Sequence, residues 1–199
     1  MKIDLHVHSF ECSRCASSTE KEQIEAAIAR GLDGIAFTDH NHQRSQIYLE
    51  HLNEKYAPFK IFTGTEINPI DTGEDVLIFG VPELEEMNDY YWEYAELFAY
   101  VRERGGFIVL AHPFRYDTHV RTNVSTFVPD ALEIRSTNVH PRCYRPIQKL
   151  ANKLGVHTIA TSDSHHRSNI GQHYVIFQNE VYSDAALVRE LKAGRYEIF

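Results

Sequence analysis

Short apolar runs alternate with amphipathic segments along the whole chain. Runs of four to eight residues that are apolar or alternate apolar with polar positions predict strands. Eight such runs occupy residues 2–8, 33–40, 60–67, 75–81, 107–113, 131–136, 157–164 and 174–178. Several of them are almost wholly apolar, which is typical of strands covered by helices on both faces.

The segments between these strands predict helices. Thr19 and Glu22 have the spacing of a capping box, so a helix should begin after Thr19, and Gly31 should end it. Further helices are predicted at 43–55, 84–104, 141–154 and 183–193. Repeated strand–helix units without a Pro/Gly/Ser-rich linker indicate one α/β domain over 1–199, either a barrel or an open sheet.

The composition is that of a folded globular protein rather than a disordered one. Of 199 residues, 43% are hydrophobic and 12% aromatic, which is ample for a core. No apolar segment is long enough for a signal peptide or a membrane span. Three cysteines, an odd number, argue against a secreted disulfide framework. The Cys12-x-x-Cys15 pair has no second pair to complete a zinc knuckle, so structural thiols and a cytoplasmic location are expected.

The charge narrows the range of partners. A formal net charge of −8 predicts a surface that repels nucleic acid and anionic membranes. Bound divalent cations would reverse that sign locally.

Histidine is unusually frequent, with 12 in the chain, and two of them close the first strand in the sequence DLHVHS (4–9). Positions i and i+2 of a strand share a face, so His6 and His8 should point together, with Leu5 and Val7 facing the other way. Such a pair alone is compatible with a metal site or with ordinary polar packing.

Further metal-type side chains follow the other predicted strands. Asp39 and His40 end the second strand, and Glu66, His112, Asp163 and His165 end or follow later ones. His140 lies in the loop after 131–136. Because the carboxyl ends of parallel strands converge, these groups could share one cavity.

The donor set suggests a type of chemistry. Mixed nitrogen and oxygen ligands suit zinc, manganese or iron(II). A carboxylate such as Glu66 could bridge two ions about 3.5–4 Å apart, an arrangement that clamps phosphoryl oxygens and activates water. The chain has neither a G-x-S-x-G nucleophile motif nor a P-loop.

The motifs DLHVHS, TDHN, GTEIN, AHPFR and SDSH, in this order, resemble the PHP (polymerase and histidinol phosphatase) superfamily, and the likeness extends to the LKAGR near the end. The resemblance implies a distorted (β/α)7 barrel that binds two or three divalent metal ions (Mn, Zn or Fe). It also implies metal-dependent hydrolysis of a phosphoester, either a small phosphomonoester or a nucleotide-type phosphodiester. The expected partner is a small phosphorylated substrate.

The resemblance also assigns roles to individual residues. His6, His8, Glu66 and Asp163 would hold one ion, and Glu66 would bridge to a second ion held by His112, with His140 as a further ligand. His40 and His165 match ligands of a third ion, and Asp4 and Asp39 would orient ligands from behind. The residues expected to be catalytic are Glu66, Asp163 and His165.

The chain departs from the family pattern after DLHVHS. Trinuclear relatives usually carry Asp or His five or six residues past the second histidine, where this chain has Ser13 and Arg14. The third ion could bind more weakly, or could take Glu11 or Cys12 instead, or Arg14 could act there as an anion clamp. Arg14, Arg115 and Arg135 are candidates for gripping phosphate, because guanidinium matches phosphate bidentately; a surface ion pair is the alternative for each.

Two other functions remain open from the sequence. A 3′-exonuclease-like activity is known in the family, although the net charge and the lack of a basic tract count against it. A non-catalytic scaffold, in which metal serves only folding, is the other.

Overall fold

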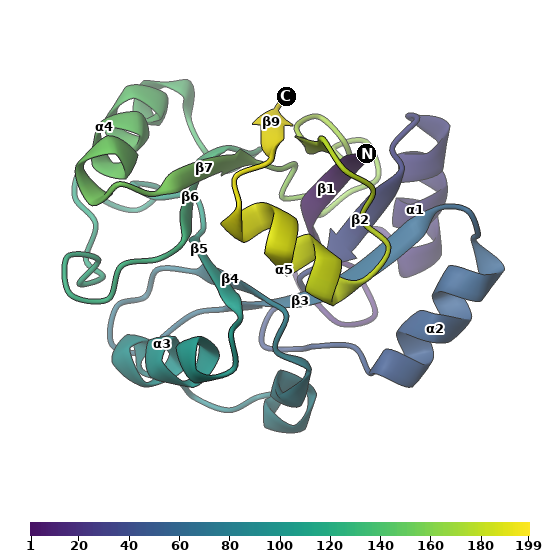
Figure 1. The fold of residues 1–199 in the computed structure, drawn as a ribbon, viewed down its shortest axis with the longest axis horizontal. Helices are drawn as coiled ribbons and strands as arrows, with labels where there is room; N and C mark the ends of the chain where they lie inside the picture. The colour runs from purple at the N-terminus through teal and green to yellow at the C-terminus, as the bar shows by residue number, and fades with distance from the viewer.

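The computed structural model describes residues 1–199, which form nine strands, five α-helices and two short 3₁₀ helices (Figure 1). The strands are β1 (Lys2–Val7), β2 (Gly34–Phe37), β3 (Lys60–Ile67), β4 (Val76–Phe79), β5 (Phe107–Leu110), β6 (Ala131–Arg135), β7 (His157–Ala160), β8 (Val175–Phe177) and β9 (Tyr196–Ile198). The α-helices are α1 (Glu20–Ala29), α2 (Gln46–Lys55), α3 (Tyr94–Glu103), α4 (Tyr144–Leu154) and α5 (Asp184–Lys192). The 3₁₀ helices are η1 (Pro82–Met87) and η2 (Pro141–Cys143).

All strands belong to one sheet, in the order β7-β6-β5-β4-β3-β2-β1-β8-β9. β1, β2 and β3 are parallel, and so are β5, β6 and β7. The sheet curls until the segment after β7 meets β1, where Val7 forms a parallel bridge with Ser164. The backbone N–H of His8 donates to the Ser164 carbonyl over 2.9 Å at this seam. The predicted α/β fold is therefore confirmed as a single, nearly closed, distorted barrel.

β4 interrupts the parallel order, because it pairs antiparallel with both β3 and β5. The link from β3 to β4, residues 68–75, contains no helix. A parallel return needs a crossover of a dozen or more residues, so this short link forces a hairpin. The carboxyl end of β4 consequently lies at the opposite end of the barrel from that of β3.

Helix α5 closes the end of the barrel where the parallel strands begin. Leu187, Val188 and Leu191 join a buried cluster with strand side chains that include Ile3 and Phe107. Figure 1 shows α5 lying across the middle of the strands. One end of the barrel is thus filled with apolar side chains, which leaves the carboxyl ends of the parallel strands for a site.

Two further apolar layers cover the outside of the sheet. Side chains of α1 and α2 pack with those of β1–β3, and side chains of α3 and α4 pack with those of β4–β6. Every residue of β2, β4 and β5 is buried, in agreement with the nearly continuous apolar runs in the sequence.

The capping box at the start of α1 is confirmed. The Glu22 N–H donates to Thr19 Oγ1 over 3.2 Å, and the Thr19 N–H donates to Glu22 Oε2 over 2.9 Å. These two bonds satisfy backbone donors that the first helical turn leaves free.

The single helix predicted at 84–104 is wrong, because residues 88–93 separate η1 from α3. Asn88 has extended backbone (ψ 136°), and its side chain accepts from the Gln43 N–H over 2.7 Å and donates to the Gln43 carbonyl over 3.2 Å. Asp89 then has φ 65°, which no α-helix accommodates. Tertiary hydrogen bonds outweigh the local helical pattern here.

A register irregularity in β1 lies between Asp4 and Val7. Val7 packs with the outer layer of α1, as expected, but Leu5 packs inside the barrel with α5. A bulge of this type re-aims side chains relative to strict alternation. The expected outward position of Leu5 is therefore wrong, whereas His6 and His8 share a face.

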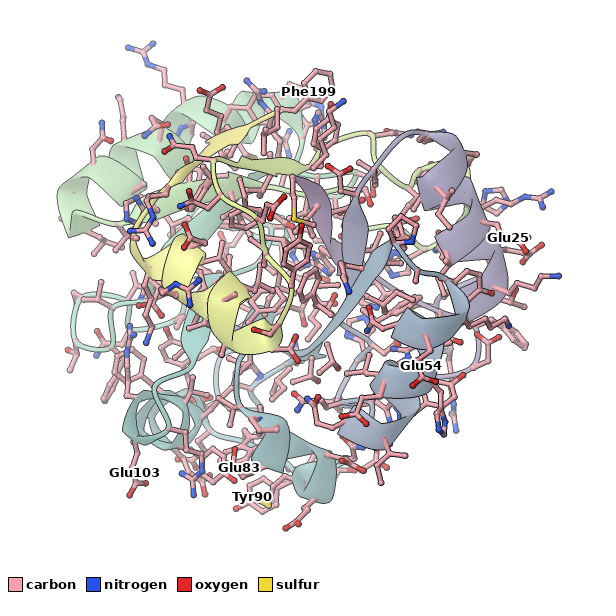
Figure 2. The ribbon with its side chains drawn as sticks, turned by 45° about the vertical axis from the view of Figure 1, so that its right-hand side comes forward. Glu25, Glu54, Glu83, Tyr90, Glu103 and Phe199 are labelled. Carbon is pink, nitrogen blue, oxygen red and sulfur yellow. The ribbon has the colours of Figure 1, made fainter.

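The outer surface carries many acidic groups. The labelled glutamates Glu25, Glu54, Glu83 and Glu103 are all exposed and project outward from the helices (Figure 2). No helix in the structure combines the length and the apolar character needed to cross a bilayer.

Candidate metal centre

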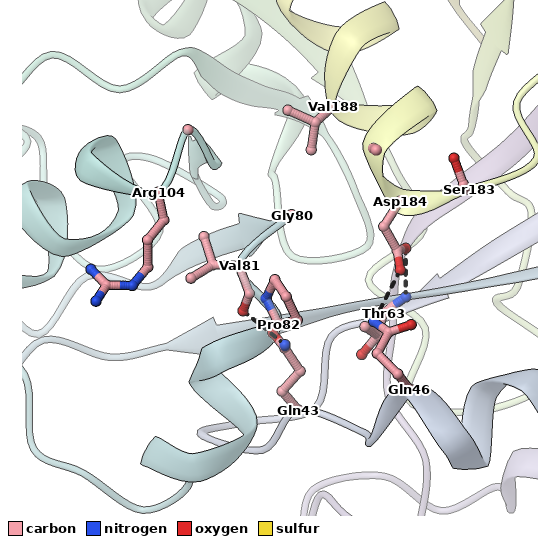
Figure 3. A pocket seen from close by; sticks show the side chains of 12 residues that line it. Gln43, Gln46, Thr63, Gly80, Val81, Pro82, Arg104, Ser183, Asp184 and Val188 are labelled. Carbon is pink, nitrogen blue, oxygen red and sulfur yellow. Dashed lines mark hydrogen bonds between the residues drawn. The ribbon is translucent and has the colours of Figure 1, made fainter.

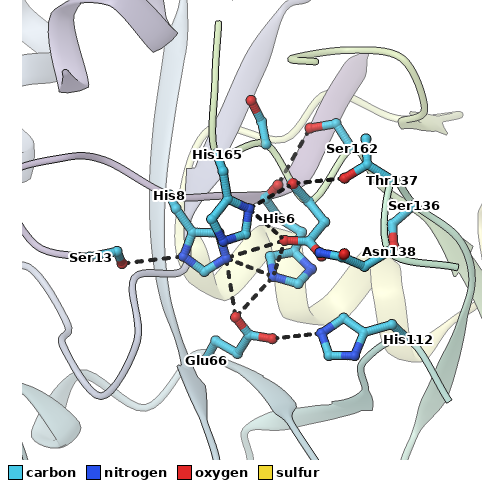
Figure 4. A network of polar contacts seen from close by, with 12 residues as sticks. His6, His8, Ser13, Glu66, His112, Ser136, Thr137, Asn138, Ser162 and His165 are labelled. Atoms are coloured by element: carbon cyan, nitrogen blue, oxygen red, sulfur yellow. Dashed lines mark hydrogen bonds and ion pairs between the residues drawn. The ribbon is translucent and has the colours of Figure 1, made fainter. Parts of the chain in front are cut away.

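The metal-type side chains named from the sequence converge at the carboxyl ends of the parallel strands (Figure 4). His6 and His8 come from the end of β1, Glu66 from β3, and Asp163 from the loop after β7. All four are almost completely buried, with exposures of 0 or 1%. The cluster is built from segments that lie far apart in the chain.

Four ligand atoms of this cluster lie close together: Nε2 of His6, Nε2 of His8, Oε2 of Glu66 and Oδ1 of Asp163. The two imidazole nitrogens are 3.0 Å apart. Glu66 Oε2 is 3.2 Å from the His6 nitrogen and 3.1 Å from the His8 nitrogen, and Asp163 Oδ1 is 3.3 and 3.4 Å from them. A tetrahedral ion with ligands at about 2.0–2.2 Å holds them about 3.3–3.6 Å apart. The five separations, 3.0–3.4 Å, lie at the lower end of this range or slightly below it, as expected for donor atoms that converge on one ion.

The hydrogen bonding at Asp163 supports the same fit. Its Oδ2 accepts from the Asn138 amide over 2.5 Å, but its buried Oδ1 has no hydrogen-bond donor. An unpartnered buried carboxylate oxygen is costly, and a cation at the centre of the four ligand atoms would satisfy it.

Glu66 also faces a second position. Its Oε1 lies 3.0 Å from His112 Nε2, which is 3.6 Å from Asp75 Oδ2. Its Oε2 is 3.3 Å from His40 Nδ1 as well as contributing to the first position. Glu66 therefore directs Oε2 toward His6 and His8 and Oε1 toward His112, which is the arrangement that a bridging carboxylate would need.

Glu133 fixes the orientation of His6. Its Oε1 lies 2.9 Å from His6 Nδ1, so that nitrogen carries the proton and Nε2 is free for a metal. Thr161 Oγ1 also donates to Oε1, while the His112 N–H and Ser136 Oγ donate to Oε2 over 2.8 and 3.1 Å. The carboxylate thus ties two ligand-bearing strands together.

A similar chain of contacts lies behind His8. Its Nδ1 is 3.3 Å from Ser13 Oγ, which donates to Asp39 Oδ1 over 2.7 Å. Arg44 is buried, pairs with Asp39 through Nη1, and bonds Glu20 through Nε at 3.0 Å. Asp39 therefore acts on His8 through Ser13 rather than by direct contact.

Asp4 lies deeper and holds the backbone of the Asp163 loop. It accepts from the Ser162 and Gly171 N–H groups, both over 2.9 Å. Burial raises its pKa to about 6 despite these bonds. Its contacts are with the loop that carries Asp163, not with a ligand imidazole.

The pKa values of the clustered imidazoles and carboxylates are shifted in the directions expected of a cation-binding site. Burial opposes the charged form of His8, yet the neighbouring carboxylates of Asp163 and Glu66 raise its pKa to about 9. Burial likewise opposes ionisation of Glu66, but the neighbouring imidazoles, His6 foremost, hold its pKa well below the usual range. Without metal, protons on the imidazoles balance the carboxylates.

Two ligands sit on strained backbone. His112 has φ 28° and Asp163 has φ 50°, in the left-handed region that side chains other than glycine seldom adopt. Such conformations cost of order 1–3 kcal/mol and are typical of functional sites.

Four other residues predicted for the site lie outside the cluster, whereas His165 borders it, with its Nδ1 3.4 Å from Asp163 Oδ1. His140 is exposed, and its Nδ1 accepts from the Arg142 N–H at the start of η2. Arg14 is exposed, Arg115 lies over the Tyr116 ring at 5.1 Å, and Arg135 lies over the Tyr144 ring at 5.7 Å. His165 stacks on His8 with ring centroids 4.3 Å apart.

The sequence reading missed Glu133, Asp75 and Arg44. Glu133 could have been recognised, because it is the only carboxylate in the apolar strand β6 and lies near the carboxyl end of that strand. Asp75 directly precedes an apolar run, at the amino end of β4, and only the reversal of that strand brings it to the site. Arg44 had no signal in the sequence.

A separate hollow of about 490 Å³ lies at the other end of the barrel (Figure 3). Gly80 and Val81, which follow the reversed β4, line it together with Asp184 at the start of α5. Asp184 Oδ1 and Oδ2 accept bonds from the Thr63 N–H and the Gln46 amide, both at 3.4 Å. None of the residues proposed to bind metal lines this hollow.

Comparisons with known proteins agree with this geometry. The model of the PHP domain family matches residues 4–112, and that of a PHP-associated family matches residues 145–196. The comparison with curated proteins finds no match.

Solved structures share the fold at low sequence identity. A protein from Bifidobacterium adolescentis, provisionally described as a metal-dependent phosphoesterase, is 15% identical with TM-score 0.71, covering 95% of each chain. A two-domain Bacteroides vulgatus protein containing a predicted PHP-like metal-dependent phosphoesterase is 14% identical with TM-score 0.71, covering 100% of this chain and 64% of its own. An amidohydrolase from Chromobacterium violaceum with bound sulfate and no metal is 18% identical with TM-score 0.68, covering 99% and 98%.

The matched family region contains DLHVHS, TDHN, GTEIN and the histidine of AHPFR, which supply most of the converging ligands. On this match and this geometry, the chain belongs to the PHP family, whose members include metal-dependent hydrolases.

Proposed function

We propose that this protein hydrolyses a phosphoester of a small molecule, with divalent ions held by His6, His8, Glu66, Asp163 and His112. The observation that carries the proposal is the convergence of ligand atoms from His6, His8, Glu66 and Asp163, with five separations of 3.0–3.4 Å and an unpartnered Asp163 Oδ1. Bound divalent ions supply two things: a lowered pKa for a coordinated water and positive charge beside phosphoryl oxygens.

Individual side chains position the ions and orient the ligands. Glu66 presents one oxygen to each of two positions and so fixes their separation. Glu133 and Ser13 select the imidazole tautomers that leave Nε2 of His6 and His8 unprotonated when a cation is bound. Asp163, on strained backbone, completes the set of ligands.

A cavity beside the His112 loop supports binding of an anionic substrate. It has a volume of about 600 Å³, and its lining includes Arg115, Tyr116 and Arg142. Arg115 follows His112 by three residues, so it can reach from this cavity toward a phosphate at the ions. A guanidinium binds phosphate through two parallel hydrogen bonds. Of the three predicted arginines, Arg115 lines this cavity.

The neighbouring structures add support at the level of substrate class. Two of them carry names of metal-dependent phosphoesterases, and the Chromobacterium violaceum structure contains sulfate, which resembles phosphate in shape and charge. That neighbour is called an amidohydrolase, so amide hydrolysis is the second candidate. Water activation by metal serves attack at phosphorus and at an amide carbonyl alike.

The test is turnover by metal-loaded protein on a panel of sugar phosphates, nucleotides, a phosphodiester, a DNA oligonucleotide and simple amides. We expect phosphate or alcohol release that chelator abolishes and Mn²⁺ or Zn²⁺ restores. Asp163→Asn should lower kcat/KM at least about 100-fold, because the ligand geometry that activates water is lost.

His165→Ala and His166→Ala form a matched pair of adjacent histidines. His165 stacks on His8, whereas His166 is exposed and bonds Ser168, so only His165→Ala should reduce turnover. Hydrolysis of amides alone, or of DNA alone, would replace the proposed substrate class. No turnover of any substrate by metal-loaded protein would favour a metal-binding scaffold.

A further inference from the structure

A second cluster of ligand atoms lies on the solvent side of the centre described above. His8, Cys15, His40 and His165 each place one ligand atom within 4.8 Å of the others. The His8 ring lies against both other imidazoles, with centroids 4.8 Å from His40 and 4.3 Å from His165. The thiol of Cys15 therefore faces histidines rather than its sequence neighbours.

Both ring nitrogens of His8 already have partners in the buried metal centre. Its Nε2 lies 3.1 Å from Glu66 Oε2, and its Nδ1 faces Ser13 Oγ. The donors that remain for another ion are Cys15, His40 and His165, which make an N₂S set. Zinc and cobalt(II) accept such a set in tetrahedral geometry, with water as a fourth ligand.

The loop that carries Cys15 is held in place by its own backbone. The Ser13 N–H donates to the Ser9 carbonyl over 2.8 Å, and the Ala16 N–H donates to the Ser13 carbonyl over 3.0 Å. The Ser17 N–H then donates to the His165 carbonyl over 2.8 Å, and Ala16 is buried. Two residues beyond Cys15, the chain is thus bonded to the backbone of the second donor, His165.

Cys12 has different surroundings, although it belongs to the same C-x-x-C. It lines a hollow with Glu11, Glu20 and Arg44, on the side of the buried Arg44–Asp39 pair. It belongs to none of the groups of converging ligand atoms. Cys12 was one of the replacements considered from the sequence, but the structure brings Cys15 to the histidines.

Exposure sets this cluster apart from the buried centre. Cys15 is exposed, and the side chains of His40 and His165 are 35% and 25% exposed, against 0–1% for the ligands of the first ion. An ion here would exchange more readily with solvent. A thiolate also makes the position softer than the carboxylate-rich centre below it.

We propose that Cys15 is a thiolate ligand of a third metal ion, together with His40 and His165, and that this outer position selects zinc-type ions over manganese. Binding converts the Cys15 S–H to a sulfur–metal bond and releases the proton to solvent. The softer sulfur takes the place of the Asp or His expected in trinuclear relatives. The inference rests on the metal binding of the proposed function but not on turnover.

Cobalt(II) titration of metal-free protein tests it, with the near-ultraviolet thiolate-to-cobalt charge-transfer absorption as the readout. The parent and Cys12→Ser should develop this absorption, whereas Cys15→Ser should lack it and bind about one equivalent less cobalt. Cys15 is exposed, so serine there leaves the core untouched. Persistence of the absorption in Cys15→Ser, or its absence from the parent, would overturn the inference.

Alkylation of the parent by iodoacetamide gives a second readout that needs no variant. Zn²⁺ should slow modification of Cys15 at least about tenfold and leave that of Cys12 unchanged, because a metal-bound thiolate is a poor nucleophile. Mn²⁺ should protect much less. Equal Cys15 rates with and without Zn²⁺ would contradict a sulfur–metal bond. A thiolate-to-cobalt absorption that depends on Cys15, found without phosphoester turnover, would contradict only the proposed function. Phosphoester turnover without that absorption would contradict only this inference.

Discussion

At the scale of single residues, the Glu133 carboxylate makes four hydrogen bonds behind the cluster of proposed ligands. It accepts from His6, Thr161, Ser136 and the His112 backbone, so both carboxylate oxygens are fully used. A carboxylate behind a metal-binding imidazole fixes its tautomer and raises its basicity. The residue was not recognised from the sequence, since the spacing alone cannot show that Glu133 points at His6 across the barrel.

Glu133→Gln should weaken binding of the first ion about 10- to 100-fold, because an amide cannot accept from His6 Nδ1 as strongly as a carboxylate. Competition titration against a chromophoric chelator measures the affinity directly. Glu103→Gln, on the exposed end of α3, is the control and should bind like the parent. Unchanged affinity in Glu133→Gln would remove Glu133 from the metal centre.

The protonation of His8 makes metal binding depend on pH. In the metal-free protein burial opposes the charged form, but Asp163 and Glu66 outweigh it and raise the pKa from 6.5 to about 9. Below pH 9 a cation must displace this proton, so metal affinity should rise between pH 6.5 and pH 9. Titrations across this window check the slope, and a flat profile would show that His8 is not a ligand.

Stability of the metal-free protein should move in the opposite direction. Because the folded pKa of His8 lies above its unfolded value, its contribution is complete below pH 6.5 and is lost as pH rises through about 9. The Tm of chelator-treated protein should therefore fall across this window. Loading with metal should flatten or reverse that fall.

At the scale of elements, the sequence predicted the positions of the strands better than their directions. The apolar runs located β1–β8 well, and the capping box located the start of α1. The split of 84–104 was not predictable, because Asn88 ends η1 by bonding Gln43, which is distant in sequence. The antiparallel direction of β4 decides that Asp75 reaches the site, and local periodicity does not encode direction.

The contact between β4 and α5 can be tested at Gly80. This residue has φ +74°, and a Cβ there would lie 2.5 Å from Val188 Cγ2 in α5. Gly31 also has φ +74° but has no atom within 4 Å of such a Cβ. Gly31→Ala should cost about 1–2 kcal/mol from backbone strain alone.

Gly80→Ala should cost about 1–3 kcal/mol more than the control, because the methyl group overpacks the end of the barrel. Urea denaturation gives both free energies of unfolding. Val188→Ala in the Gly80→Ala background should recover part of the difference. Equal losses in the free energy of unfolding for Gly80→Ala and Gly31→Ala would mean that α5 does not pack against the turn at Gly80.

At the scale of the whole molecule, the centre collects ligands from β1 to the loop after β7, across nearly the entire chain. The sequence predicted most of this set, namely His6, His8, Glu66, His112 and Asp163, because each closes or follows an apolar strand. His140, Arg14 and Arg115 were harder, since they lie on loops whose course depends on tertiary contacts. A centre that joins so many segments should also stabilise the fold, by about 2.7 kcal/mol at a metal concentration of 100 times Kd.

We predict that Glu66 bridges two ions in one cluster, and the metal content per chain is the measurement that decides this. Elemental analysis of parent protein reconstituted with Mn²⁺ or Zn²⁺ should show at least about two equivalents. Glu66→Ala should lose both, because one oxygen serves each position, whereas Glu83→Ala on the exposed η1 should match the parent. Less than one equivalent in the parent, or parental content in Glu66→Ala, would contradict the account.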